Sequence, residues 1–139
     1  MKELNIEAKI ENLETVLDFV SAELEAADCS MKLQTQIAIV VEEIFVNIAH
    51  YAYNPETGGA VIRLAIGDEI KIEFEDSGKP YNPLENVDPD ITAGAEEREI
   101  GGLGIFMVKK IMDAVEYEYK DRKNILTIRK VFNEGESRP

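Results

Sequence analysis

The chain has 139 residues, of which 45% are hydrophobic and 31% charged, a composition typical of a soluble globular protein. Its formal net charge of −13 argues against a broad basic patch, so we expect neither nucleic acid nor an anionic membrane as a direct partner. Cys29 is the only cysteine, which excludes an intrachain disulfide and a cysteine cluster for zinc. The N-terminus lacks a signal-peptide pattern, and no apolar run approaches the ~20 residues that span a bilayer. We therefore expect a cytoplasmic protein with one domain over residues 1–139.

Hydrophobic periodicity predicts five strands and three helices. Period-two alternation predicts strands over residues 4–10, 60–66, 69–75, 115–119 and 125–131, with short turns at 67–68 and 120–124. Helical spacing predicts helices over residues 11–27, 31–53 and 105–113, the first two separated by a break at 28–30. Because short turns join consecutive strands, the five-stranded sheet should be mostly antiparallel. Three helices on one of its faces give an α+β two-layer sandwich.

The second helix carries a narrow polar stripe within an otherwise apolar sequence. Glu43 and Asn47 lie one turn apart on one face, and Gln36 and His50 fall near the same line, whereas Glu42 points about 100° away and is read as surface. Apolar residues flank the stripe on both sides, namely Val40, Ile44 and Ile48 on one side and Ile39 and Val46 on the other. This pattern indicates a partly buried cleft wall, although a solvated face stays open as the alternative.

The chemistry of the stripe suits a hard cation better than a transition metal. With His50 as the only histidine and a single cysteine, a transition-metal site is not expected, and His50 is read as a packing residue. Asn47 offers a neutral amide oxygen, which suits a magnesium ion that keeps its waters and borrows phosphate oxygens. Glu43 could deprotonate a hydroxyl if an electrophile lay nearby.

Two further segments supply features of a nucleotide site. Asp76 leaves the end of a strand, where its carboxylate can accept a hydrogen bond from an exocyclic amine, and Gly78 would let a flat base approach the backbone. A plain Asp-Ser-Gly turn is the alternative. The glycines of Gly101-Gly-Leu-Gly104 run straight into a helix, whose N-terminus favours phosphate groups. Taken alone this motif is weak, because the βαβ context of a dinucleotide fingerprint is missing.

The order and spacing of the three segments are more specific than each segment alone. E-x-x-x-N (Glu43 to Asn47), D-x-G-x-P (Asp76 to Pro80) and G-G-x-G (Gly101 to Gly104) together resemble the N, G1 and G2 boxes of the GHKL ATP-binding superfamily, which has the Bergerat fold. The resemblance covers nearly the whole chain. The compact form without added domains looks most like the anti-sigma factor serine/threonine kinases.

The resemblance implies a role for each matching residue. Asn47 would coordinate Mg²⁺, Glu43 would be the general base, and Arg98 is the candidate for the arginine near the γ-phosphate, although its offset from the glycines does not match securely. The residues expected to bind the nucleotide are Asn47, Tyr51, Asp76, Gly78, Pro80, Gly101, Gly102, Leu103, Gly104 and Thr127. Asp76 would bind the adenine amino group with support from Thr127, and residues 82–100 would form a mobile lid over the phosphates, which fits the irregular, proline-containing sequence there. Tyr51 takes the place of a histidine found in many relatives, which leaves the role of His50 open.

The resemblance also implies partners. The expected function is ATP-dependent phosphorylation of a serine on a STAS-type anti-anti-sigma protein, together with binding of a sigma factor. Homodimerisation is a further implication, with the first strand and helix as the interface. The alternatives are an ATP-binding module without kinase activity, a histidine-kinase-like ATPase domain, and a protein that binds no nucleotide. The histidine-kinase alternative is disfavoured because the only histidine, His50, lies within the N-box helix.

Overall fold

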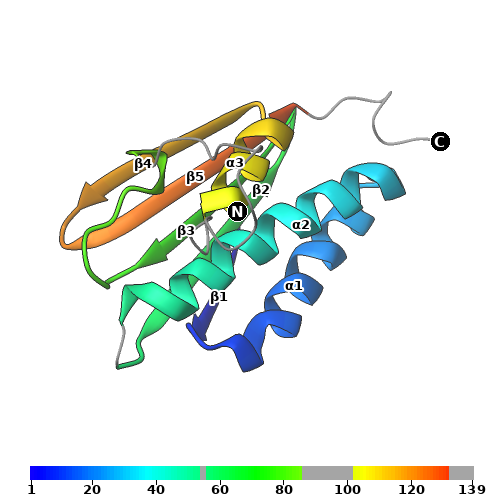
Figure 1. Cartoon of the computed structure of the whole chain (residues 1–139). Helices are drawn as coiled ribbons and strands as arrows, with labels where there is room; N and C mark the ends of the chain where they lie inside the picture. Colours follow the sequence, from blue (N-terminus) through cyan, green and yellow to red (C-terminus); the bar gives the residue numbers. More distant parts are fainter. Residues whose placement is uncertain (54–55, 86–101, 132–139) are drawn as a thin grey trace.

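Three helices pack against one face of a five-stranded sheet in the computed structural model, which describes residues 1–53, 56–85 and 102–131 (Figure 1). The strands are β1 (Lys2–Glu7), β2 (Gly59–Ile66), β3 (Glu69–Asp76), β4 (Ala114–Lys120) and β5 (Lys123–Val131). The helices are α1 (Leu13–Ala26), α2 (Met31–Asn47) and α3 (Gly102–Ile111). The sheet order is β1-β2-β3-β5-β4, and every neighbouring pair is antiparallel. The predicted α+β two-layer sandwich is therefore confirmed.

The core lies between the helices and the inner face of the sheet. Alternate residues of the central strands are fully or almost fully buried there, as their period-two pattern requires, namely Ile62, Leu64, Ile70, Ile72, Phe74 and Ile128. α1 and α2 bury residues at helical spacing against them, including Val16, Val20, Leu24, Ile37, Val41 and Phe45. The outer face of the sheet, in contrast, carries charged side chains.

The predicted break between the first two helices is confirmed. Asp28 adopts a left-handed conformation with φ of 63°, which ends α1. Ser30 caps α2, because its hydroxyl accepts the backbone N–H of Leu33 at 3.1 Å. None of the helices in the described ranges is both long and apolar enough to cross a membrane.

Several boundaries differ from the sequence prediction, including the start of α3, which is Gly102 instead of Ile105. α2 ends at Asn47 instead of Tyr53, and a single wide π-helical turn, η2 (Ile48–Ala52), follows it. The turn between β4 and β5 is limited to Asp121 and Arg122, both with positive φ, so Asn124 lies inside β5. β1 ends at Glu7, because the chain enters a 3-10 turn at Ile10–Asn12, labelled η1. π-helical turns such as η2 are often found at functional sites.

Candidate functional site

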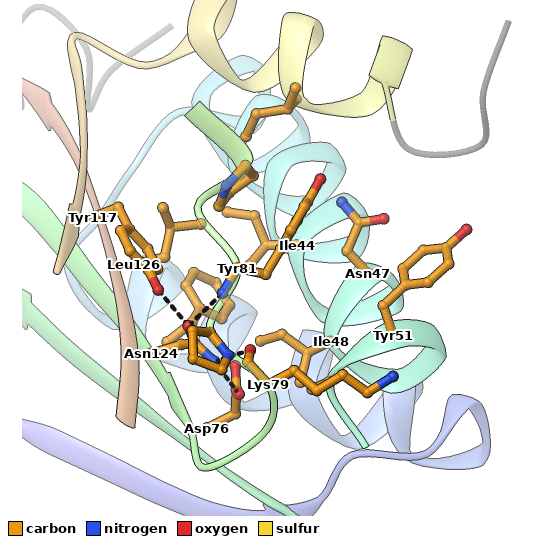
Figure 2. A pocket seen from close by; sticks show the side chains of 15 residues that line it. Ile44, Asn47, Ile48, Tyr51, Asp76, Lys79, Tyr81, Tyr117, Asn124 and Leu126 are labelled. Atoms are coloured by element: carbon orange, nitrogen blue, oxygen red, sulfur yellow. Dashed lines mark hydrogen bonds between the residues drawn. The ribbon is translucent and has the colours of Figure 1, made fainter. Parts of the chain in front are cut away.

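A cavity of about 610 Å³ opens between α2, α3 and the inner face of β3 and β5 (Figure 2). Its size lies within the range of small-molecule sites. Apolar side chains form most of its wall, namely Ile44, Ile48, Ala52, Phe74, Pro80, Pro83, Ile105 and Leu126. Its polar or aromatic lining residues are Asn47, Tyr51, Asp76, Lys79, Tyr81, Tyr117 and Asn124. An apolar pocket with a few converging polar groups is suited to a flat, partly polar ligand.

Asp76 provides a carboxylate within this apolar wall. It is the last residue of β3 and is only 7% exposed. One carboxylate oxygen, Oδ1, accepts the backbone N–H of Gly78 at 2.9 Å and the Nδ2 group of Asn124 at 2.9 Å. Burial raises the pKa of Asp76, while the hydrogen bonds from Asn124 and Gly78 act to lower it. The second oxygen, Oδ2, receives no donor from the part of the chain that the structure describes.

Asn124 connects Asp76 to the loop that follows it. The antiparallel register of β3 and β5 places the two residues opposite each other, and Asn124 is 6% exposed. Its Nδ2 group also donates to the carbonyl oxygen of Lys79 at 2.8 Å, and its Oδ1 accepts the backbone N–H of Tyr81 at 3.0 Å. The Tyr117 hydroxyl donates to the same Oδ1, as the dashed lines in Figure 2 mark. A buried amide with all its hydrogen bonds made holds its neighbours in one arrangement.

Gly78 is required by packing of the backbone. A Cβ atom at this position would collide with the backbone carbonyl of Ala52, at the end of the wide turn η2. The same carbonyl accepts the backbone N–H of Lys79 at 2.9 Å. The turn after Asp76 therefore rests directly on η2, which gives Gly78 a role that the sequence prediction of close approach by a base did not include.

Tyr53 fixes the other side of the same junction. Its hydroxyl donates to the carbonyl oxygen of Gly59 at 2.6 Å and accepts the backbone N–H of Ser77 at 2.7 Å. Burial raises the pKa of the Tyr53 hydroxyl, so it stays protonated and able to donate at neutral pH. The end of η2, the start of β2 and the end of β3 are thus held together beside the pocket.

The polar stripe of α2 reaches the pocket only in part. Asn47 lines the cavity, and so does Tyr51, which is 43% exposed and contacts the His50 ring edge-on with centroids 5.9 Å apart. Glu43 is half-buried on α2, one turn before Asn47, but it is not among the residues that line the cavity. Glu42 is exposed, as predicted. His50 is exposed as well, so the interpretation of His50 as a packing residue is wrong.

Only one of the two expected apolar shoulders of the stripe lies in the protein interior. Val40 and Ile44 are buried, and Ile44 lines the cavity. Ile39, on the other side of the stripe, is 42% exposed. The stripe therefore marks the edge between the pocket and solvent instead of lying in a cleft with two apolar walls.

The glycine motif lies at the start of α3. Gly102, Leu103 and Gly104 form its first turn, and Ile105, the next residue, lines the cavity. In Figure 2 the start of α3 lies over the Asn47 side of the pocket. Gly101 and Arg98 lie outside the described residues, as does the predicted lid except for its first residues, where a 3-10 turn covers Pro83–Glu85.

Thr127 does not reach the pocket, so the prediction that it supports a bound base is wrong. The register pairs Thr127 with Glu73 on β3 and with Glu116 on β4. Because side chains alternate along a strand, Thr127 points to the outer face, while its neighbour Leu126 lines the cavity. On β5 the cavity is lined by Asn124 and Leu126.

Sequence reasoning missed Asn124 and Tyr117. The sequence pattern places Asn124 in the turn 120–124, and Tyr117 belongs to no motif. The signal that could have found Asn124 is the alternation of β5, since Asn124, Leu126 and Ile128 are buried at every second position. A polar residue at an inward position at the end of a strand indicates a buried hydrogen-bond network.

The comparisons with known proteins give one family, several relatives and one similar fold. The family described as Histidine kinase-like ATPase domain matches residues 6–130. Serine/threonine-protein kinase BtrW of Bordetella bronchiseptica is 26% identical over 102 residues, which cover 71% of each chain. Serine-protein kinase RsbW of Listeria monocytogenes is 27% identical over 104 residues, covering 70% of this chain and 66% of the relative. The anti-sigma F factor of a Thermoanaerobacter species is 28% identical over 127 residues, covering 91% and 89%.

A solved structure extends the likeness to the whole fold. A chain in the SiaB–SiaC complex from Pseudomonas aeruginosa superimposes with a TM-score of 0.58, covering 95% of this chain and 90% of its own length. The sequences are 16% identical, so this likeness concerns the fold alone.

Proposed function

Since the chain belongs to the histidine kinase-like ATPase domain family, we propose that it is an ATP-dependent anti-sigma factor serine kinase. In this proposal it transfers the γ-phosphate of ATP to a serine of a STAS-type anti-anti-sigma protein and also binds a sigma factor. Relatives of 26–28% identity are named as protein kinases and as an anti-sigma factor. The observation that carries the proposal is the mostly apolar pocket, which Asp76 and Asn47 both line and in which Oδ2 of Asp76 accepts no hydrogen bond from the described residues.

The deep part of the pocket fits an adenine base. Apolar side chains such as Ile48, Phe74 and Leu126 line the cavity, and an aromatic ring would pack against them. The free Oδ2 atom of Asp76 accepts a hydrogen bond from the exocyclic amine of the base. Orientation then follows from one directional bond, while burial of the ring supplies most of the affinity.

The phosphates of the nucleotide are assigned to the Asn47 side of the pocket. The first turn of α3, which begins at Gly102, has backbone N–H groups that lack a partner within the helix, and it carries the positive end of the helix dipole. Ile105 of the same helix lines the cavity, so this turn starts beside it. Gly101 and Arg98, which precede the helix, are proposed to add contacts to the phosphates.

Magnesium is proposed to accompany the nucleotide. Asn47 lines the cavity, and its amide oxygen would suit a hard cation, which prefers oxygen ligands and keeps waters and phosphate oxygens as its other ligands. When bound, the ion would neutralise charge on the phosphates during transfer. The Asn47 side chain itself would fix the position of the phosphates relative to α2.

Glu43 is the proposed general base for transfer. It shares the Asn47 face of α2 and is half-buried, so a serine entering beside the γ-phosphate would meet it. The serine Oγ attacks the γ-phosphorus, the bond from that phosphorus to the bridging oxygen breaks, and ADP leaves. The proton of the hydroxyl passes to Glu43.

The proposed partners fit the charge and topology of the chain. A net charge of −13 suits a partner with a basic segment, which is the property expected of the sigma factor. β1 is an edge strand, so one row of its backbone groups is available for a second copy in a homodimer.

Phosphotransfer is the direct test. The purified chain, incubated with labelled ATP, Mg²⁺ and each STAS protein encoded in the same genome, is expected to label one serine. Glu43→Ala should keep nucleotide binding and lose transfer by roughly 100-fold or more. Glu42→Ala is the matched control, because this neighbouring glutamate is exposed and should leave the rate unchanged.

The second candidate is a nucleotide-binding module without transfer, and the position of Glu43 outside the cavity lining favours it. It predicts that the wild-type chain binds ADP and ATP but labels no serine. A calorimetric titration with each nucleotide, run alongside the labelling, separates the two candidates. If no nucleotide binds, both candidates are wrong.

A further inference from the structure

The two carboxylate oxygens of Asp76 differ in the hydrogen bonds that they accept. Oδ1 accepts two hydrogen bonds, one from the backbone N–H of Gly78 and one from Nδ2 of Asn124, both at 2.9 Å. Within the described ranges Oδ2 accepts none, and Asp76 lines the cavity. A ligand in the pocket therefore meets a carboxylate with one oxygen already occupied.

The orientation of the Asn124 amide follows from its backbone partners. The N–H of Tyr81 can only donate, so the atom it contacts at 3.0 Å must be the amide oxygen. The carbonyl of Lys79 can only accept, so the atom it contacts at 2.8 Å must be the amide nitrogen. A flipped amide would face both groups with the wrong atom. Nδ2 is thereby directed at Asp76, as Figure 2 shows.

Tyr117 completes this arrangement from β4. Its hydroxyl donates to the second lone pair of the Asn124 amide oxygen. Both hydrogens of the Asn124 Nδ2 group and both lone pairs of the Asn124 Oδ1 atom then take part in hydrogen bonds. Because every bonding position is filled, Asn124 cannot turn away from Asp76 without breaking one buried and three part-buried hydrogen bonds.

The occupied oxygen distinguishes between purine bases by the number of donors they present. Adenine offers one exocyclic amine, which needs one acceptor oxygen. Guanine offers a ring N–H and an exocyclic amine side by side, and these pair with both oxygens of a carboxylate. When only Oδ2 is free, one guanine donor stays buried without a partner, which is costly.

We propose that Asn124, held by Tyr117, is the specificity-determining residue that selects adenine over guanine by occupying Oδ1 of Asp76. Asn124 acts through Asp76 and is a positioning residue in this role. The inference rests on the proposed function, because it assumes that the pocket binds a purine nucleotide. It assigns base selection to two side chains outside the three sequence motifs.

The test compares the binding of ADP, GDP and purine riboside diphosphate, which lacks the exocyclic amine, by calorimetry. The wild-type chain should prefer ADP over GDP by roughly 100-fold. Asn124→Ala should reduce this preference by about tenfold, and it should also reduce the penalty for removing the amine from the ligand. Asn5→Ala is the control, since this asparagine lies exposed on β1 and should leave the preference unchanged.

A purely structural role for Asn124 predicts a different pattern. The affinities for all three ligands would then fall by the same factor, and an unchanged ADP to GDP ratio would overturn the inference. If Asn124→Ala does not fold, Tyr117→Phe provides the same measurement, with an expected reduction of the ratio by about threefold. Failure of the wild-type chain to bind any of the nucleotides would instead refute the proposed function, and the inference with it.

Discussion

The sheet carries a polar network on each face, and the two networks differ in their access to water. On the inner face, Asp76 and Asn124 are 7% and 6% exposed and bond to each other and to the following loop. On the outer face, Arg63 contacts Glu3 at 2.9 Å, Glu75 at 3.0 Å and Glu73 at 3.6 Å.

The outer network has more formal charge, but water can replace its contacts. Side-chain exposure ranges from 12% to 48% among Arg63 and its three partners, so each group keeps part of its hydration. Removing one member of the inner network leaves buried donors and acceptors unpaired, which costs their full desolvation. The comparison teaches that burial, more than charge, decides which network stabilises the fold and shapes a site. Four predictions test it, from the largest expected effect to the smallest.

Asn124→Ala should reduce the free energy of unfolding by about 2–4 kcal/mol. The substitution removes the buried hydrogen bond to Asp76 and the part-buried hydrogen bonds to the Tyr81 N–H and the Lys79 carbonyl. Thr127→Ala, three residues along the same strand but on the outer face, should change stability by no more than about 0.5 kcal/mol. Urea denaturation measures both, and equal losses would contradict the distinction between the two faces.

Asp76→Asn should reduce the affinity for ADP by roughly 10- to 100-fold while the fold is kept. The Asn oxygen can still accept from Gly78 and Asn124, but an amide NH₂ then replaces the free acceptor Oδ2. Because the cost of burying a charge disappears, the stability of the unliganded variant should equal or exceed that of the wild type. Calorimetry and thermal melting together check the two parts. Loss of stability without loss of affinity would show that Asp76 serves the fold alone.

Acid should weaken nucleotide binding. Burial raises the pKa of Asp76, and the base amine requires the ionised carboxylate, so affinity should fall as pH drops through that raised pKa, by up to about tenfold per pH unit below it. The effect on folding has the opposite sign. The folded chain holds this proton more tightly than the unfolded chain, so this contribution to stability is complete below the unfolded pKa and is lost as pH rises through the folded one.

The Asp76→Asn variant is the control for this pH dependence. Protonation of the phosphates or the base of ADP changes the affinity of the variant and of the wild type equally. The difference between their affinity–pH profiles therefore reports on Asp76. Titrations of ADP between about pH 4.5 and 7.5 should show a steeper profile for the wild type. Parallel profiles would exclude Asp76 as the group that contacts the base amine.

Arg63→Ala should have the smallest effect, a loss of about 1 kcal/mol or less, even though it breaks three ion pairs. The loss should shrink further in about 0.5 M salt, because exposed charges are screened. Urea denaturation at low and high salt measures it. A loss as large as that of Asn124→Ala would mean that charge on the outer face matters as much as burial on the inner face.

The sequence by itself determined the layers of the fold and the outline of the site. Period-two alternation in residues 60–66 and 69–75 specified paired strands with one apolar face, since that pattern has a single way to bury its hydrophobic side. The helical stripe indicated Asn47, and a carboxylate at the end of a strand indicated Asp76, and both line the cavity. These features depend on the spacing of residues along the chain, which the sequence shows directly.

Only the tertiary structure decided which side chains share the pocket. Asn124 lies 48 residues from Asp76 in the chain, and the β3–β5 register alone brings them together. The same register pairs Thr127 with Glu73 on the outer face of the sheet. Gly78 likewise meets the carbonyl of Ala52 only after η2 is in place. Contacts between distant segments depend on register and packing of whole elements, which no local pattern in the sequence encodes.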